Sequence, residues 1–423
     1  MCLKQYMCCK KKKSISLLLG AGFSAPMGYP IGNELNNKLL NCANDNIAFD
    51  RAGELRFNKN GRKIDFGKGN PYEWYFSFCK DMIRYYNNIK EFDYEEFYDY
   101  YKEQKKKKDD VGLEELFDKS DYPKFGIENF DSYLFNIDGI YNQLVAFYLK
   151  DKDGKSWYDD EPMRSKPTFE GYTGFLNCIE ELAKNHVINV HTLNHDLFFE
   201  RLNNTEWIKG EICDGFEELG SPFYGELQHD NRTYKCRLSK YTGNYDKNIR
   251  LYKLHGSMDY HNFYSAPNGI ARLDGYIKTR YGIGPSNCCK ETKDRNGNLV
   301  YEENHENSNH PNFLTGKDSK IIRYKSDLYK KLFEQFKKNL NEAEILIIIG
   351  YGCNDDEINK IIMTEFGRNK PCYIVNPCPN KEVDDFISQM GKNTDFVRGK
   401  EKDKIEFKKI ADIELSDFKV FLK

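Results

Sequence analysis

Two short polar segments contain residue types that could carry out acid–base chemistry. Asn194 and Asp196 flank one residue in Thr-Leu-Asn-His-Asp, just after the apolar run 187–190. His255 follows a shorter apolar run, within Lys-Leu-His-Gly-Ser. A histidine beside an amide and a carboxylate can hold or move a proton on a ligand hydroxyl or a water. The structural alternatives are a helix cap at Asp196 and a histidine that only packs at a strand end.

Glycine-rich turns follow two other apolar runs. Gly20–Ser24 (GAGFS) comes directly after the run 14–19, and Gly350–Gly352 (GYG) comes directly after the run 345–349. Glycine lets a backbone approach a pyrophosphate, and a helix that begins next supplies N–H donors and a positive dipole. The first spacing is not Gly-x-Gly-x-x-Gly, because the third glycine is Gly28. A tight turn without a ligand is therefore an equal alternative.

Two further polar residues stand beside these turns. Asp355 follows the second glycine turn and opens a predicted helix. Asn376 follows the apolar run 372–375 and could reach a ribose hydroxyl. The structural alternative is a simple turn at Asn376-Pro377.

Short apolar runs predict the strands that must position all of these residues. They are Ser14–Leu19, Val187–Val190, Ile345–Ile349 and Cys372–Val375, with Leu251–Leu254 as a weaker candidate. Helical patterns cover Gly32–Leu40, Leu197–Leu202, Lys325–Asn341 and Asp355–Phe366. Apolar runs that alternate with helices are typical of a parallel sheet buried on both faces. We therefore predict an α/β fold with a Rossmann-like doubly wound parallel sheet, whose ligands bind at the carboxyl ends of the strands.

Length and composition exclude several classes of protein. The chain has 423 residues and a formal net charge of −2, which excludes a strongly basic nucleic-acid-binding protein. Direct nucleic-acid binding is therefore not expected. Aromatic residues make up 15% of the chain, which excludes a disordered protein. No run approaches the roughly 18 apolar residues of a transmembrane helix, so no membrane association is expected.

The 13 cysteines form no recognisable pattern. No Cys-x-x-Cys occurs, and the adjacent pair Cys288-Cys289 lacks the spacing at which two thiolates chelate zinc. An odd, scattered set indicates reduced intracellular thiols. The basic residues 1–13 are not followed by a long apolar segment, so a cytoplasmic protein is expected.

Two long segments lie outside the predicted sheet. Residues 41–185 are dense in Tyr, Phe, Lys, Glu and Asp, and Glu91–Gln104 shows helical spacing of its aromatic residues. We interpret 41–185 as a helical, aromatic-rich insertion, and its lysine run 105–108 as a solvated loop rather than a nucleic-acid site. Residues 260–324 are rich in Asn, Gly and Lys and predict loops with small strands.

The ordered set of motifs resembles the sirtuin-like NAD-binding family. A glycine turn with Ser24, then Thr-Leu-Asn-His-Asp, Leu-His-Gly-Ser, Gly-Tyr-Gly and Val-Asn-Pro follow one another in the family's order. The set is most similar to the divergent bacterial branch found in antiphage defence, whose members hydrolyse NAD. The resemblance implies one domain over 13–423, with 41–185 inserted in it and the loop-rich segment 260–324 in place of a zinc module.

The resemblance also implies a role for each motif residue. Asn194 would place the attacking water, His255 would contact the ribose and act as a base, and Asp196 would bond the nicotinamide carboxamide. The residues that bind NAD would be Gly20, Ala21, Gly22, Ser24, Thr192, Gly350, Tyr351, Gly352, Asp355 and Asn376. The first turn would hold the phosphates, and the second turn would line the adenosine side. NAD would be the substrate, and no metal is expected.

The sequence departs from the family's protein deacylases at three places. Leu193 stands where they have Gln, Met27–Ile31 lacks their Arg, and no two Cys-x-x-Cys pairs follow His255. A deacylase needs an acyl-lysine tunnel beside that zinc module, so water is the expected acceptor. The resemblance therefore implies an NAD glycohydrolase. The alternatives are a non-catalytic subunit that senses NAD or ADP-ribose, and an NAD-dependent deacylase or ADP-ribosyltransferase.

Control of the activity is expected to come from assembly. Unregulated NAD loss would be toxic to the cell, and the sequence suggests no added sensor domain. We therefore expect a homo-oligomer with an activating protein partner, and subunit contacts through 41–185. In related antiviral systems that act by abortive infection, such partners include an ATP-driven DNA translocase and an Argonaute-like protein. The sequence does not select between them.

Overall fold

The strands predicted from the apolar runs form one parallel sheet. The computed structural model describes residues 12–42, 47–49, 55–57, 71–123, 129–157, 169, 171–229, 232–266, 269–305, 310–312, 327–377, 380–391, 393–396, 398–401, 404–407, 410–414 and 416–417. Within these residues the sheet has seven strands, in the order β17-β16-β15-β1-β4-β10-β5, and every neighbouring pair is parallel. The strands are β1 (Lys13–Leu19), β4 (His186–Thr192), β5 (Ile212–Cys213), β10 (Ile249–Lys253), β15 (Ala343–Ile349), β16 (Cys372–Val375) and β17 (Thr394–Phe396).

Helices cover both faces of this sheet. On central strand β1, Leu17 and Leu19 pack into one apolar cluster and Leu18 packs into another, because successive side chains point to opposite faces. Helices α6 (Thr173–Asn185) and α7 (Phe198–Arg201) contribute to the first cluster, and α9 (Asp327–Glu342), α10 (Asp356–Glu365) and α11 (Lys381–Met390) contribute to the second. The predicted doubly wound α/β class is therefore confirmed.

The order of the strands places a reversal at β1. From β1 the chain first builds the β4 and β10 side of the sheet, and then crosses to build β15, β16 and β17 on the other side. In an open parallel sheet, ligands bind outside the carboxyl ends of the strands where the order reverses. The predicted polar turns all lie at this edge.

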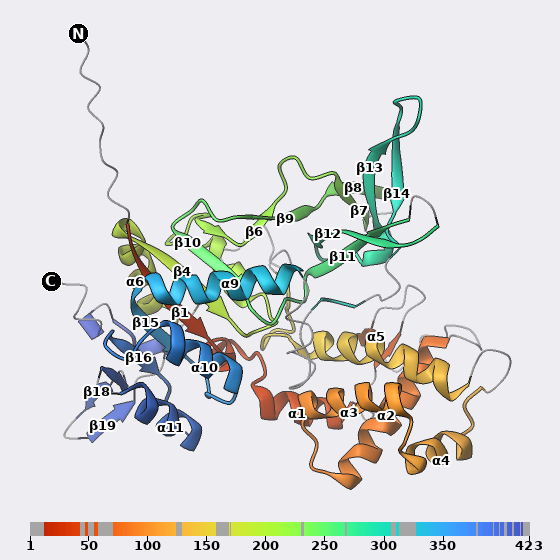
Figure 1. Ribbon diagram of the computed structural model, residues 1–423, viewed down its shortest axis with the longest axis horizontal. Coiled ribbons are helices and arrows are strands. Elements are labelled where there is room, and N and C mark those ends of the chain that lie inside the picture. Colours follow the sequence, from red (N-terminus) through yellow and green to blue (C-terminus); the bar gives the residue numbers. More distant parts are fainter. Residues whose placement is uncertain are drawn as a thin grey trace.

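A helical bundle with its own aromatic core lies beside the sheet (Figure 1). Its helices are α1 (Gly32–Leu40), α2 (Pro71–Ile89), α3 (Tyr94–Lys107), α4 (Val111–Lys119) and α5 (Phe130–Tyr148), next to the short hairpin of β2 (Ile47–Phe49) and β3 (Leu55–Phe57). Helices α2 to α5 fall within the expected insertion 41–185, and α1 joins them from outside it. Helix α6, at the end of that segment, packs on the sheet instead.

Two antiparallel sheets come from the described chain between β4 and α9. The described residues contain two four-stranded sheets, in the orders β11-β12-β9-β6 and β14-β13-β7-β8. Their strands are β6 (Gly215–Glu217), β7 (Phe223–His229), β8 (Arg232–Arg237), β9 (Ser239–Asn244), β11 (Tyr260–Ser265), β12 (Arg272–Lys278), β13 (Cys288–Lys293) and β14 (Leu299–Glu303). The sequence predicted loops with small strands over 260–324. The observed β-structure is more extensive and begins near residue 215.

The last described strands, β18 (Arg398–Glu401) and β19 (Lys404–Phe407), form a small hairpin after the sheet. Among the helices of the described residues, none has both the length and the apolar character needed to cross a membrane.

Candidate functional site

The register of the parallel strands aligns the predicted site residues. Thr192 at the end of β4 pairs with Leu19 on one side and with Lys253 on the other. Leu19 also pairs with Ile349, which in turn pairs with Val375. All five strands therefore end at one level, and the polar turn after each strand starts from the same edge of the sheet.

The two glycine turns pack directly on each other. The Gly20 amide donates to the Ile349 carbonyl at 3.0 Å, and the Gly22 amide donates to the Gly350 carbonyl at 2.9 Å. A Cβ added to Gly20 would lie 2.5 Å from the Gly350 oxygen. Gly350 has a φ of +64°, and a Cβ added there would lie 2.3 Å from the Phe23 nitrogen. These glycines are thus required by backbone packing alone, and their contact with a ligand stays a prediction.

The first turn also uses most of its own amides. The amides of Gly20 and Gly22 donate to the carbonyls at the end of β15 and the start of the second turn, as described above. The Phe23 amide donates to the Gly20 carbonyl at 2.9 Å, and the Ser24 amide donates to the Ala21 carbonyl at 3.2 Å. A phosphate at this turn would have to be bound by donors other than these four amides.

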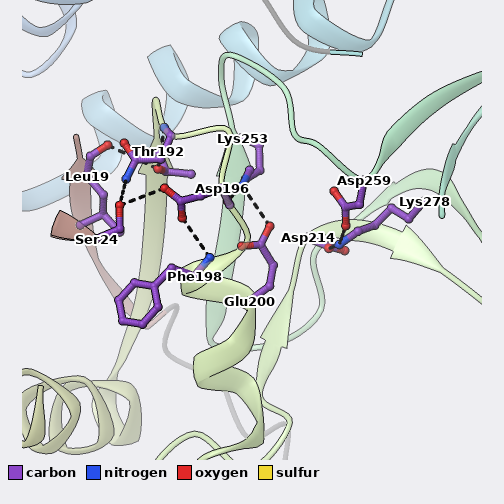
Figure 2. A network of polar contacts seen from close by, with 11 residues as sticks. Leu19, Ser24, Thr192, Asp196, Phe198, Glu200, Asp214, Lys253, Asp259 and Lys278 are labelled. Carbon is purple, nitrogen blue, oxygen red and sulfur yellow. Dashed lines mark hydrogen bonds and ion pairs between the residues drawn. The ribbon is translucent and has the colours of Figure 1, made fainter. Parts of the chain in front are cut away.

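A hydrogen-bonded network joins the first turn to the segment after β4 (Figure 2). The Ser24 hydroxyl, which is 1% exposed, donates to Asp196 Oδ2 at 2.9 Å. Asn194 Nδ2 donates to the Gly20 carbonyl at 3.0 Å and to Ser24 Oγ at 3.3 Å. The Thr192 hydroxyl accepts from the Asn194 amide at 3.1 Å. The sequence predicted these residues at one site, and the structure brings them together through Ser24.

Asp196 is fixed through both carboxylate oxygens. Oδ2 accepts from Ser24, and Oδ1 accepts from the Phe198 amide at 2.9 Å. The second bond is a local contact at the start of α7, but the N-cap residue of that helix is Leu197, so Asp196 is not the helix cap weighed as the structural alternative. A carboxylate has about four lone-pair sites on its two oxygens, so two bonds leave capacity for a ligand N–H.

His255 lies beside a carboxylate from the other half of the sheet. The His255 ring, which is 4% exposed, has its Nε2 3.4 Å from Asp355 Oδ2. Asp355 also caps α10 by accepting from the Ile358 amide at 3.1 Å. Strands β4 and β1 lie between β10 and β15, so these two loops fold toward each other across the edge. The Asp355 carboxylate can therefore orient the imidazole.

The remaining predicted residues lie at the same edge and have structural contacts. Tyr351 is buried, and its hydroxyl contacts the Asp355 carbonyl at 3.1 Å and Asn359 Oδ1 at 3.0 Å. Burial raises the Tyr351 pKa well above its usual value. The Gly352 carbonyl accepts from the side chain of Asn380 at 3.3 Å. Asn376 is partly buried at the end of β16.

Sequence reasoning missed a buried charged group next to Asp196. Arg201 Nη1 lies 2.8 Å from Asp151 Oδ2, with both side chains at most 4% exposed, and it donates to the Tyr29 hydroxyl at 3.0 Å. Burial raises the pKa of Tyr29, and the Asp196 charge adds to that shift. Arg201 is five positions after Asp196, but no local pattern connects it with Asp151, which lies 50 residues earlier.

The helical bundle reaches the same edge of the sheet. The Tyr94 amide at the start of α3 donates to Asn36 Oδ1 at 2.9 Å. Burial is the largest cause of a raised Tyr94 pKa, and the charge of Asp355 contributes to it. The start of α3 is therefore bonded to α1, the helix that follows the first glycine turn.

The adjacent cysteines are part of the β-structure. Cys288 and Cys289 are consecutive residues of β13, both buried, so their side chains point to opposite faces of a sheet. Burial raises the Cys288 pKa to about 12. Within the described ranges, no cluster of three or more His, Cys, Asp or Glu side chains is arranged to hold a metal ion.

Comparisons with known proteins give only distant matches. No family model and no curated protein matches the chain. Solved structures that match include one described for the mechanism and regulation of Sir2 enzymes, with 12% identity, a TM-score of 0.34 and coverage of 97% of this chain and 94% of that chain. Another is a Sir2 homologue–NAD complex, with 10% identity, a TM-score of 0.33 and coverage of 91% and 84%. A third, described for sirtuin substrate affinity, has 13% identity, a TM-score of 0.29 and coverage of 91% of each chain. At TM-scores this low, the fold is assigned from its strand order and register.

Proposed function

We propose that this chain is an NAD glycohydrolase that cleaves NAD to nicotinamide and ADP-ribose. One observation carries the proposal. Asn194 and Asp196 are held in one network with Ser24 at the end of β4, and His255 occupies the equivalent position after the neighbouring strand β10. An amide, a carboxylate and an imidazole thus lie at the edge where parallel sheets bind ligands.

The reaction replaces the bond between ribose C1′ and the nicotinamide nitrogen by a bond from C1′ to a water oxygen. Nicotinamide leaves with the electron pair of the broken bond, and the attacking water loses a proton. His255 is the base that accepts this proton, directly or through a ribose hydroxyl, and Asn194 places the water. The lone pairs of Asp196 that remain available accept from the nicotinamide carboxamide. A general base of this kind contributes about 10²–10⁴-fold to a rate.

The burial of these groups supports the proposal. Ser24, Asp196 and His255 are all below 7% exposed, so the site holds its dipoles in a medium of low polarity. Fixed dipoles in such a medium stabilise developing charge more strongly than they do in water. The Asp355 carboxylate beside His255 stabilises the imidazolium that forms when the base takes up its proton.

Binding of the rest of NAD is assigned to the same edge. The turn Gly20–Ser24 would lie along the phosphates, and Gly350–Gly352 with Asn376 would line the adenosine side. Water is the proposed acceptor because the sequence has no Cys-x-x-Cys pair from which the family's zinc module could form. Asn194 and His255 are both present, which favours catalysis over NAD sensing.

Nicotinamide release from NAD alone tests the proposal. With the neighbouring gene product present, we expect the wild-type chain to form nicotinamide and ADP-ribose, and His255→Ala and Asn194→Ala each to lower the turnover by at least about 10²-fold. The matched control is His186→Ala, a partly exposed histidine at the opposite end of β4. Circular dichroism shows whether each variant is folded.

Three other outcomes would contradict the proposal. If either site variant keeps wild-type turnover, the site is assigned wrongly. If products form only with an acetyl-lysine peptide, the chain is a deacylase. If ADP-ribose binds but NAD is not cleaved even with the neighbouring gene product present, the chain is a sensing subunit.

The biological setting is part of the proposal. We place the chain as an NAD-depleting effector of bacterial antiphage defence, active as an assembled homo-oligomer with a protein partner. The motif resemblance supports this setting. Measuring the oligomeric state and the NAD turnover, each with and without the neighbouring gene product, tests it.

A further inference from the structure

The last residue of β10 places a buried ammonium against the segment that carries the proposed site. Lys253 is 1% exposed, and its Nζ donates to the backbone carbonyl of Asp196. The same Nζ lies 3.2 Å from Oε1 of Glu200, whose side chain is 8% exposed (Figure 2). The proposed reaction uses neither Lys253 nor Glu200.

A buried ammonium requires a partner of this kind. Removing a charge from water costs several kcal/mol unless an opposite charge and hydrogen bonds replace the solvent. Glu200 supplies the charge, and the carbonyl of Asp196 supplies the hydrogen bond. Burial raises the pKa of Glu200, and the charge of Lys253 opposes that shift. Breaking the Lys253 contact would leave a buried charge without compensation, so this contact holds the Asp196 backbone in position.

The contact between Lys253 and Asp196 joins the loop after β10 to the loop after β4. Lys253 pairs in register with Thr192, and His255 follows it by two residues, as Asn194 follows Thr192. A backbone hydrogen bond from the Met258 amide to the His195 carbonyl, at 3.1 Å, ties the same two loops farther along. Lys253 is the side chain that connects the end of β10 with the backbone at Asp196.

A second ion-paired lysine, of low exposure, lies in the same region without touching the site. Lys278 on β12 has its Nζ 2.5 Å from Asp214 Oδ2 and 3.2 Å from Asp259 Oδ2. Figure 2 shows this group beside the Lys253–Glu200 pair. Lys278 is therefore a matched control, because it is also an ion-paired lysine of low exposure but does not bond Asp196.

We propose that Lys253 is a positioning residue, which holds the segment Asn194–Asp196 in register with His255 through the Asp196 carbonyl and the ion pair with Glu200. This inference rests on the proposed NAD hydrolysis. Lys253 touches none of the reacting groups, so it acts on the geometry of the water and the leaving group rather than on the affinity for NAD.

Steady-state kinetics of the full-length chain is the first test. We expect Lys253→Met to lower kcat by up to about 10²-fold with KM nearly unchanged, because small misplacements of reacting groups cost rates of that order. Lys278→Met should leave kcat close to wild type. The double variant Lys253→Met/Glu200→Gln removes both buried charges, so it should recover stability without recovering kcat. A recovery of kcat together with stability would overturn the positioning role.

Hydrogen exchange is a second test that does not depend on activity. We expect faster amide exchange over 193–199 in Lys253→Met and in Glu200→Gln, and unchanged exchange there in Lys278→Met. Unchanged exchange in both site variants would overturn the inference. The two proposals fail separately: a wild-type chain that releases no nicotinamide even with the neighbouring gene product present contradicts NAD hydrolysis, whereas the exchange data decide the role of Lys253 in either case. If Lys253→Met does not fold, Glu200→Gln supplies the same comparison.

Discussion

A single residue, Asp196, connects most of the polar contacts of the proposed site. Its two carboxylate oxygens accept from Ser24 and from the Phe198 amide, and its backbone carbonyl accepts from Lys253. Its charge contributes to the raised pKa of Tyr29. A carboxylate held at both oxygens, on a backbone that is itself held, has little freedom to rotate, which is what the orientation of a leaving group requires.

Another single residue predicts an acid sensitivity of the fold. His191 in β4 is fully buried, and its ring is stacked 4.9 Å from the ring of Tyr252. Burial lowers the His191 pKa to about 3. The unfolded chain therefore binds a proton below about pH 6.5 that the folded chain does not bind, so stability falls as the pH drops from 6.5 toward 3.

His191→Phe should remove this contribution, because a phenyl ring fits between the aromatic neighbours. Between pH 7 and pH 5 the free energy of unfolding of the wild type should fall by roughly 2 kcal/mol more than that of the variant, since each pH unit is worth about 1.4 kcal/mol per histidine. Urea unfolding at the two pH values measures the difference. His186→Phe, at the partly exposed start of the same strand, is the control. An equal pH dependence in wild type and His191→Phe would contradict the prediction.

At the scale of elements, a buried ion pair connects the end of the helical bundle with the site. Asp151, just after α5, pairs with Arg201 of α7, and its Oδ1 also accepts from the Lys155 amide at 2.7 Å. Breaking a buried pair leaves one charge uncompensated, which typically costs about 3–5 kcal/mol. A substitution that breaks this pair should therefore destabilise both helix α7 and the loop after α5.

We expect Asp151→Ala to lower the free energy of unfolding by about 3–5 kcal/mol in a urea titration. The exposed pair Lys108–Asp131 is the control, and Asp131→Ala should cost less than about 1 kcal/mol. The double variant Asp151→Leu/Arg201→Met should lose less than the sum of its single variants, because both buried charges are gone. Additive losses would show that the pair is not coupled.

The strands also show which parts of the fold could be predicted from the sequence. Four parallel strands, β1, β4, β15 and β16, were predictable because apolar residues dominate them, as a sheet buried on both faces requires. The short parallel strands β5 and β17 were not predicted. The antiparallel strands before residue 260 were missed because segments such as β8 (RTYKCR) are exposed along most of their length and carry no apolar pattern. Their pairing depends on contacts between distant segments, which a local pattern does not record.

The candidate site, like the fold, was predicted from the sequence only in part. The polar residues after each strand were found from their types and order, and the register now shows that they share one edge. Lys253 and Arg201 were not found, because their partners are identified only by the folded chain. The positions of the glycine turns at the strand ends were predicted, but the packing of the two turns against each other was not.

At the scale of the whole molecule, the proposed site lies where the sheet meets the helical bundle. ADP-ribose, which is a product and cannot be cleaved at the same bond, tests binding independently of catalysis. At about a hundred times its dissociation constant, a ligand specific for the folded chain stabilises it by about 2.7 kcal/mol. We expect ADP-ribose to raise the Tm of both the wild type and His255→Ala. Ribose 5-phosphate is the control, and an unchanged Tm with ADP-ribose would contradict NAD binding at this site.

The central place of β1 in the sheet has a consequence for the order of events during synthesis. Its neighbours β4 and β15 begin only at His186 and Ala343. At about 5–20 residues per second, the ribosome takes roughly 15–65 s to travel from β1 to β15. Until then Gly20 and Gly22 have no Gly350 turn to pack against, and His255 has no Asp355 beside it. A nascent or truncated chain that stops before β15 therefore cannot assemble the site, and the proposed NAD hydrolysis can begin only after β15 has been synthesised.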